Sequence, residues 1–213
     1  MKILVIAAHP DDEVVGMGGT IRKLSKNNRV ILTVVSEGAT AQYKDKKMIQ
    51  VRREACQKSG KLLGISDFIF LDFPDMRLDS VPHLEINIEL EKIIKKYKPT
   101  VVYTTPFHDL NKDHQKVFES SLVATRPQSS EVKKLLCYEF PGPVKTSFNP
   151  SVYEDITREL SIKVKAFRFY KSEIMKFPHP RSVKSIENLA IIRGIESGLC
   201  RAEAFHLIRS ISD

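Results

Sequence analysis

The sequence has no tryptophan, only three cysteines and no apolar stretch long enough to span a bilayer. The cysteines are Cys56, Cys137 and Cys200. Their odd number and the lack of a C-x-x-C motif argue against a disulfide framework and predict buried thiols in a reducing compartment. Residues 3–8 are apolar for only six positions before the charged residues 11–13, so neither a signal peptide nor a membrane-spanning helix is expected. These absences predict a cytoplasmic protein.

A basic cluster is absent as well, although 34 Lys and Arg against 26 Asp and Glu give a net charge of +8. The excess is equal on the two sides of Thr100, so it is dispersed. Proteins that bind nucleic acid concentrate positive charge on one face or helix, and we therefore predict no nucleic-acid partner. A dispersed positive surface instead suits an anionic substrate or a phosphate group. With 42% apolar and 28% charged residues, the chain can bury one core.

Short β-branched apolar runs alternate with helical patterns along most of the chain. The predicted strands cover residues 3–8, 30–35, 68–71, 100–104, 135–140 and 152–156, and the predicted helices cover 14–26, 47–63, 84–97, 114–125 and 157–170, followed by two closing helices. This alternation predicts a Rossmann-like α/β fold, with an open, mostly parallel sheet and helices on both faces. We expect a single domain over residues 1–213, with an α/β core over about 1–140 and C-terminal elements over about 141–213 packed on it.

The loop after the first predicted strand reads His9-Pro10-Asp11-Asp12-Glu13. A dinucleotide site would have glycines here, in the pattern G-x-G-x-x-G, to approach a pyrophosphate. Three carboxylates at this position oppose a phosphate and, together with an imidazole, favour a divalent metal ion. His9 and one of the two aspartates are candidate ligands, and the other aspartate would face the water. The alternative is that one aspartate caps the next helix and His9 is a solvated turn residue.

A second polar loop, residues 106–114, follows a later strand and contains two histidines and two aspartates. His114, at the start of the next helix, is the better-placed third ligand, with Asp113 beside it as an acceptor that orients its ring. Loops at the carboxyl ends of parallel strands meet at one edge of the sheet. The alternatives are helix capping by Asp113 with an exposed His114, and a simple loop role for His108.

These two motifs together resemble the PIG-L/LmbE-like family of zinc-dependent N-acetylglucosaminide deacetylases. Residues 8–13 follow the family's A-H-P-D-D-E, and residues 109–114 look like the D-x-N-x-D-H form of a branch associated with bacterial polysaccharide biosynthesis. The resemblance implies that His9, Asp12 and His114 hold one zinc ion per chain, or another divalent transition metal. It also implies that Asp11 is the general base, which the loop sequence alone left open.

The same resemblance implies roles for other positions. Many relatives have a histidine where this chain has Asn111, so we expect His179 to take over support of the oxyanion or leaving group. The expected catalytic residues are Asp11, His179 and Asp113. The expected substrate-binding residues are Asp75, Arg52, Arg53 and Asn111. Arg181 and Lys112 are candidates for contact with a substrate phosphate.

The predicted function is a cytoplasmic zinc hydrolase that removes the N-acetyl group from an amino sugar or its nucleotide- or lipid-linked conjugate. The substrate is the expected partner, and since family members assemble, a homo-oligomer is also expected. Two alternatives stay open: O-deacetylation or deformylation at the same site, and a non-catalytic sugar- or nucleotide-binding module.

Overall fold

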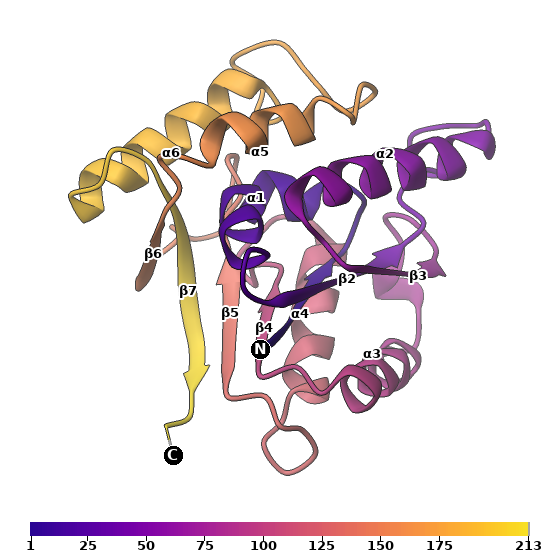
Figure 1. Ribbon diagram of the computed structural model, residues 1–213. Helices are drawn as coiled ribbons and strands as arrows, with labels where there is room; N and C mark the ends of the chain where they lie inside the picture. The colour runs from indigo at the N-terminus through magenta and orange to yellow at the C-terminus, as the bar shows by residue number, and fades with distance from the viewer. Residues whose placement is uncertain (213) are drawn as a thin grey trace.

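The computed structural model describes residues 1–212, and seven strands form one sheet in the order β3-β2-β1-β4-β5-β7-β6 (Figure 1). Neighbouring strands from β3 to β5 are parallel, and only β7 runs in the opposite direction. The strands are β1 (Lys2–Ala7), β2 (Arg29–Ser36), β3 (Asp67–Phe73), β4 (Val101–Thr104), β5 (Lys134–Tyr138), β6 (Val152–Asp155) and β7 (Ala202–Ser210). The predicted open, mostly parallel sheet is confirmed.

Helices cover both faces of this sheet, as expected. They are α1 (Asp12–Leu24), α2 (Lys47–Leu63), α3 (His83–Tyr97), α4 (Lys112–Ala124), α5 (Leu160–Phe167) and α6 (Val183–Ser197), with a short 3-10 turn η1 at Leu78–Ser80. Helices α1, α2, α5 and α6 contribute to the core on one face, whereas α3 and α4 form the core on the other. The helix predicted over residues 157–170 is shorter in the structure, where α5 has eight residues.

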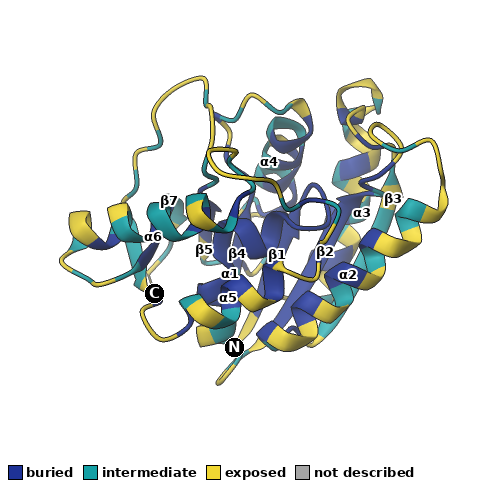
Figure 2. Cartoon of the chain, turned by 90° about the horizontal axis from the view of Figure 1, so that it is seen from above, coloured by how far each residue is buried: buried dark blue, intermediate teal, exposed yellow. Residues whose placement is uncertain are grey.

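The β1 sequence shows why the sheet is buried on both sides. Ile3, Val5 and Ala7 pack into the core below α1 and α2, while Leu4 and Ile6 pack into the core formed by α3 and α4. Successive strand residues point to opposite faces, so a strand covered on both faces needs a continuous apolar run. Figure 2 shows the result: the central strands and α1 are buried, whereas the outer sides of α2 and α6 are exposed.

The chain end differs from the sequence prediction. Only one closing helix, α6, is present, and the second predicted helix is the strand β7, which pairs antiparallel with both β5 and β6. Its first four residues are buried, because the strand lies inside the sheet and not at its edge. A further difference concerns the thiols: Cys56 and Cys137 are buried as expected, but Cys200 is exposed.

Strand β7 also places a buried carboxylate against α1. The helix is kinked at Met17, where φ is −148°, and Glu203 accepts hydrogen bonds from the freed N–H groups of Gly19 and Thr20 at 2.9 and 2.7 Å. Lys163 of α5 donates to the same carboxylate at 2.6 Å, with both side chains about 4% exposed or less. Glu203 therefore connects the last strand, α5 and the second half of α1.

Replacing Glu203 with alanine should lower the free energy of unfolding by roughly 3–5 kcal/mol, because it leaves the Lys163 ammonium buried without a partner. The matched control is Glu154→Ala, which removes the partner of the exposed Lys23 and should cost less than about 1 kcal/mol. Urea denaturation measures both values. Equal losses in the two variants would contradict the role given to Glu203.

No helix within residues 1–212 combines the length and apolar content needed to cross a membrane.

Candidate metal centre and active-site cavity

The site lies where the strand order reverses. Strand β1 pairs with β2 on one side and with β4 on the other, and all three run parallel. In open α/β sheets such a switch point leaves a crevice beyond the carboxyl ends of the strands. The loops that follow β1 and β4 carry the two polar motifs, so the pairing of these strands brings residues 9–12 next to residue 114.

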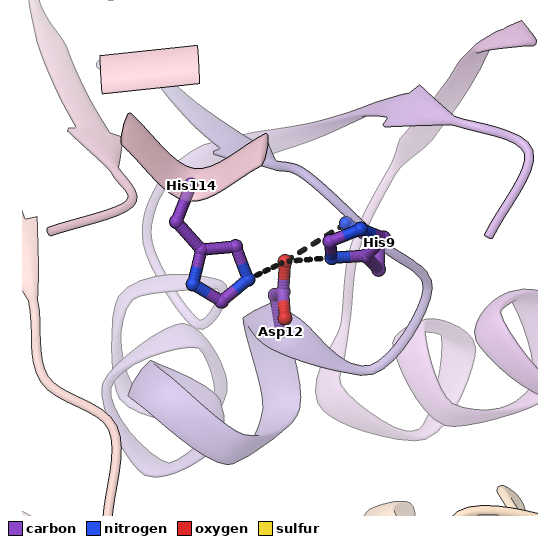
Figure 3. A group of neighbouring side chains, drawn as sticks. All are labelled: His9, Asp12 and His114. Carbon is purple, nitrogen blue, oxygen red and sulfur yellow. Dashed lines mark hydrogen bonds and ion pairs between the residues drawn. The ribbon is translucent and has the colours of Figure 1, made fainter. Parts of the chain in front are cut away.

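His9, Asp12 and His114 converge at this point, and all three are buried. The Asp12 Oδ2 atom lies 3.5 Å from His9 Nδ1 and 3.4 Å from His114 Nε2, between the two rings (Figure 3). The backbone N–H groups of Ala8 and His9 donate to the same oxygen at 3.0 and 2.8 Å. The tight turn after β1 therefore holds the Asp12 carboxylate in place independently of a metal ion.

These distances fit a tetrahedral metal ion. Ligands at about 2.0–2.2 Å from zinc lie roughly 3.3–3.6 Å from one another, which matches both separations from Asp12. His9 Nδ1 and His114 Nε2 are buried without a hydrogen-bond partner among the described residues 1–212, which is costly unless they bind something. Two imidazole nitrogens and one carboxylate suit a divalent transition metal and leave a fourth position open.

Two further aspartates orient the imidazoles. Asp109 Oδ2 lies 2.7 Å from His114 Nδ1, and Asp113 Oδ2 lies 3.1 Å from His9 Nε2. The expectation that Asp113 orients its neighbour His114 is therefore wrong, because its side chain turns from α4 toward His9 instead. The sequence signal for Asp109 was its place as the first residue of the D-x-N-x-D-H motif, five positions before His114.

Asp113 and Asp75 also form a second possible ligand group with His9. However, both Asp113 oxygens already accept backbone N–H groups, from Met76 at 2.8 Å and from Leu78 at 3.0 Å. Asp75 Oδ1 lies 3.4 Å from the same His9 Nε2 atom. This group is best explained as the outer layer of acceptors that fixes the His9 ring, since a ligating histidine donates its other N–H to a carboxylate.

The electrostatics of the centre favour bound positive charge. Burial alone would lower the pKa of His9, but the hydrogen bond to Asp113 and the nearby Asp12 carboxylate outweigh it and raise the pKa to about 10. Burial also opposes protonation of His114, but Asp12 and Asp109 raise its pKa to about 9. The pKa of Asp12 is well below its usual value, because the His114 and His9 rings outweigh the effect of its burial. A metal ion entering this site must therefore displace protons.

Asp11 lies beside the centre with a different environment. Its φ of 121° is unusual for a residue with a side chain, and in the part of the chain that the structure describes both carboxylate oxygens are buried without a hydrogen-bond partner. Burial raises the pKa of Asp11, while Arg181 and Arg52, at 3.7 and 3.5 Å, oppose that rise. A buried carboxylate with raised pKa and free oxygens is suited to accept a proton.

A cavity of about 260 Å³ opens above these residues. Its polar lining includes residues of both sequence motifs and of the segment before α6, namely Asp11, Asp12, His114, Asn111, His179 and Arg181. The Asn111 side chain accepts the Asp113 N–H at 2.9 Å and so caps α4. Much of the remaining wall is apolar, and no sequence signal had indicated it. These wall residues are Val15, Leu110, Phe140, Pro141, Pro143, Val144 and Pro180.

The other predicted site residues do not line this cavity. Arg52 is buried below the first turn, where it donates to the carbonyl oxygens of Pro10 and Gly38. Asp75 is buried behind His9 and accepts the Ala41 N–H at 3.2 Å. Arg53 points away, pairs with Asp72 and lies over the Phe70 ring. Neither Lys112 nor His108 lies on the cavity wall.

Comparisons with known proteins agree with this geometry. The PIG-L family, described as GlcNAc-PI de-N-acetylase, matches residues 4–125. The uncharacterized deacetylase YaiS of Escherichia coli is 34% identical over 179 residues, covering 80% of this chain and 90% of YaiS. The diacetylchitobiose deacetylase of Thermococcus kodakarensis is 26% identical, covering 99% of this chain and 84% of that protein. The structure of N,N'-diacetylchitobiose deacetylase from Pyrococcus horikoshii superposes with a TM-score of 0.82 at 23% identity, covering 98% of this chain and 84% of the other. The chain therefore belongs to the PIG-L family.

Proposed function

We propose that this protein is a zinc-dependent hydrolase that removes the acetyl group from an N-acetylated amino sugar or its conjugate. The observation that carries the proposal is the buried His9, Asp12 and His114 group beside Asp11, a residue that lines the cavity and whose two oxygens have no hydrogen-bond partner among residues 1–212. The relatives named as deacetylases, including two that act on diacetylchitobiose, support this substrate class. A cavity of about 260 Å³ suits a sugar-sized ligand with part of it left outside.

The residues divide the chemistry between them. Zinc held by His9, Asp12 and His114 would lower the pKa of a water molecule from about 15.7 to about 7. Asp11 accepts a proton as the water attacks the acetyl carbonyl, since its oxygens have no competing donor. Asp11 can then return this proton to the departing sugar amine.

His179 is the proposed partner on the opposite side of the substrate. Its Nδ1 atom accepts the Arg181 backbone N–H at 3.1 Å, so in the neutral ring the proton is on Nε2. An Nε2–H donor at the cavity wall can stabilise the negative oxygen that forms in the transition state. The Asn111 side chain is already engaged, because its oxygen caps α4 and its nitrogen donates to Met76 Sδ at 3.6 Å.

Replacing His179 with alanine should lower kcat by roughly 10²-fold while the bound zinc is retained, since the residue contacts substrate and not the metal. Steady-state kinetics and metal analysis of the same preparation measure both quantities. His206→Ala serves as a matched control, because the side chain of this histidine contacts the Asn149 carbonyl oxygen and the Phe107 ring and does not line the cavity. Unchanged kcat in His179→Ala would leave His179 with a structural role only.

Zinc binding should release about two protons near pH 7, because His9 and His114 are both protonated there when no metal is bound. Their raised pKa values mean that zinc affinity falls as pH decreases below about 10, because protons compete with the metal for both rings. Calorimetric titrations in buffers of different ionisation enthalpy measure the number of protons. Release of no protons near pH 7 would contradict the raised pKa values.

The proposed activity can be tested with a panel of N-acetyl amino sugars, their nucleotide-linked forms, and matched O-acetyl and N-formyl sugars. We expect acetate and free amine from an N-acetyl substrate, loss of this release with a chelator, and recovery when zinc is added. Hydrolysis of only the ester or the formamide would replace the proposal with O-deacetylation or deformylation. Sugar binding without any release by zinc-loaded protein would identify a binding module.

A further inference from the structure

Asp11 lies between two guanidinium groups, yet neither forms a hydrogen bond with it. Arg52 Nη2 lies 3.5 Å from Asp11 Oδ1, and Arg181 Nε lies 3.7 Å from Asp11 Oδ2. Arginine and carboxylate groups that are free to pair normally approach to about 2.7–2.9 Å. The carbonyl oxygens of Pro10 and Gly38 hold Arg52, and another group must hold Arg181 away from the buried Asp11 carboxylate.

The group that does so is Glu173, which lies just after α5 and is about 1% exposed. Arg181 donates from Nη1 to Glu173 Oε2 at 2.7 Å, a full hydrogen-bonded ion pair. The hydroxyl groups of Tyr43 and Ser172 donate to Oε1 at 3.1 and 2.9 Å, so the Glu173 carboxylate is held from two sides. Arg52 Nη2 also lies 3.5 Å from Oε2.

The two arginines differ in how freely they can move. Arg52 has 3% of its side chain exposed and donates to the carbonyl oxygens of Pro10 and Gly38, which fix its position. Arg181 has 29% of its side chain exposed, and the only short polar contact of its guanidinium group among residues 1–212 is with Glu173. If the Glu173 charge were absent, Arg181 would turn toward the nearest remaining carboxylate, which is Asp11.

We propose that Glu173 is a positioning residue that holds Arg181 away from Asp11, so that the Asp11 oxygens stay free to accept a proton. This inference rests on the proposed function, in which Asp11 is the general base. The Arg181 guanidinium stays close to Asp11, with Nε at 3.7 Å, but its short hydrogen bond runs from Nη1 to Glu173. A direct Arg181–Asp11 hydrogen bond would occupy the lone pairs that the attacking water needs.

The test is Glu173→Gln, which keeps the shape and can still accept from Tyr43 and Ser172 but loses the charge that holds Arg181. We expect kcat to fall roughly 10- to 100-fold, part of the 10²- to 10⁴-fold that a positioned base contributes. KM should change less than about 3-fold and the zinc content should stay at one ion per chain, because no metal ligand or substrate contact is removed. Unchanged kcat would overturn the proposal.

A double variant distinguishes a positioning role of Glu173 from a general loss of protein structure. In the double variant Glu173→Gln with Arg181→Gln, no guanidinium is left to approach Asp11, so kcat should recover at least several-fold relative to Glu173→Gln alone. A merely structural role for Glu173 predicts that the double variant is no better than the single one. The matched control is Glu139→Gln, which disrupts the buried ion pair with Arg193 outside the cavity and should lower thermal stability without lowering kcat.

A crystal structure of Glu173→Gln tests the proposal without an activity measurement. The Arg181–Asp11 separation should shorten from 3.7 Å to hydrogen-bond distance. If wild-type protein hydrolyses no substrate in the panel but this separation shortens, the proposed function fails while the role of Glu173 in holding Arg181 is upheld. If wild-type protein is active and Arg181 stays in place in the variant, the Glu173 inference fails alone.

Discussion

Replacing His114 or His9 with alanine will remove both bound zinc and hydrolytic activity. Each variant deletes one of the three converging ligand atoms and leaves Asp12 with a single imidazole partner. Three protein ligands are the usual number in a catalytic zinc site, so two should not retain the ion at micromolar concentration. Metal analysis after dialysis, together with acetate release, measures both losses.

The orienting aspartates supply the control for this prediction. In Asp109→Asn the His114 ring loses the carboxylate at its Nδ1 atom, but all three ligands remain. Removal of such a partner typically weakens metal affinity about 10- to 100-fold, so activity should return when excess zinc is added. The histidine variants should not respond to the same addition. Full zinc occupancy in His114→Ala would contradict the proposed centre.

Replacing Asp11 with asparagine should abolish turnover as well, but zinc should stay bound. Asparagine has the same shape and tolerates a positive φ, so the turn at φ 121° should persist. It cannot accept a proton in place of the carboxylate, and kcat should fall by about 10²- to 10⁴-fold. Zinc analysis and kcat measured on one preparation separate this result from loss of the metal.

Asp72 is a matched control for that substitution, because it also has a positive φ, of 58°, but is exposed and lies outside the cavity. Asp72→Asn should keep both zinc and turnover. If Asp11→Asn loses zinc to the same extent as His114→Ala, then Asp11 is part of the metal site and the assignment of the base must be abandoned.

The cavity brings together residues from distant segments. Asn111 caps α4 through its side chain, and His179 lies on the cavity wall in the segment before α6. The two positions are far apart in sequence but line the same cavity. The proposed donor His179 therefore belongs to a different segment from the proposed metal ligands.

Local patterns in the sequence were sufficient for most of the fold. The continuous apolar run of β1 predicted a strand buried on both faces, and both helical cores pack against it. The same reasoning failed for β7, because Glu203 and His206 interrupt its apolar pattern and their partners lie elsewhere in the chain. Glu203 contacts α1 and α5, and these contacts exist only after the sheet has formed.

The sequence by itself determined the candidate metal-ligand types and the alternation of strands and helices, because both depend on residues that are close together along the chain. Only the tertiary structure decided which aspartate contacts which histidine, that Arg53 points away from the cavity, and that Arg181 pairs with Glu173. Such pairings depend on side-chain direction and on contacts between distant segments. A sequence motif gives the chemical groups, but their hydrogen-bond partners are selected when the segments pack together.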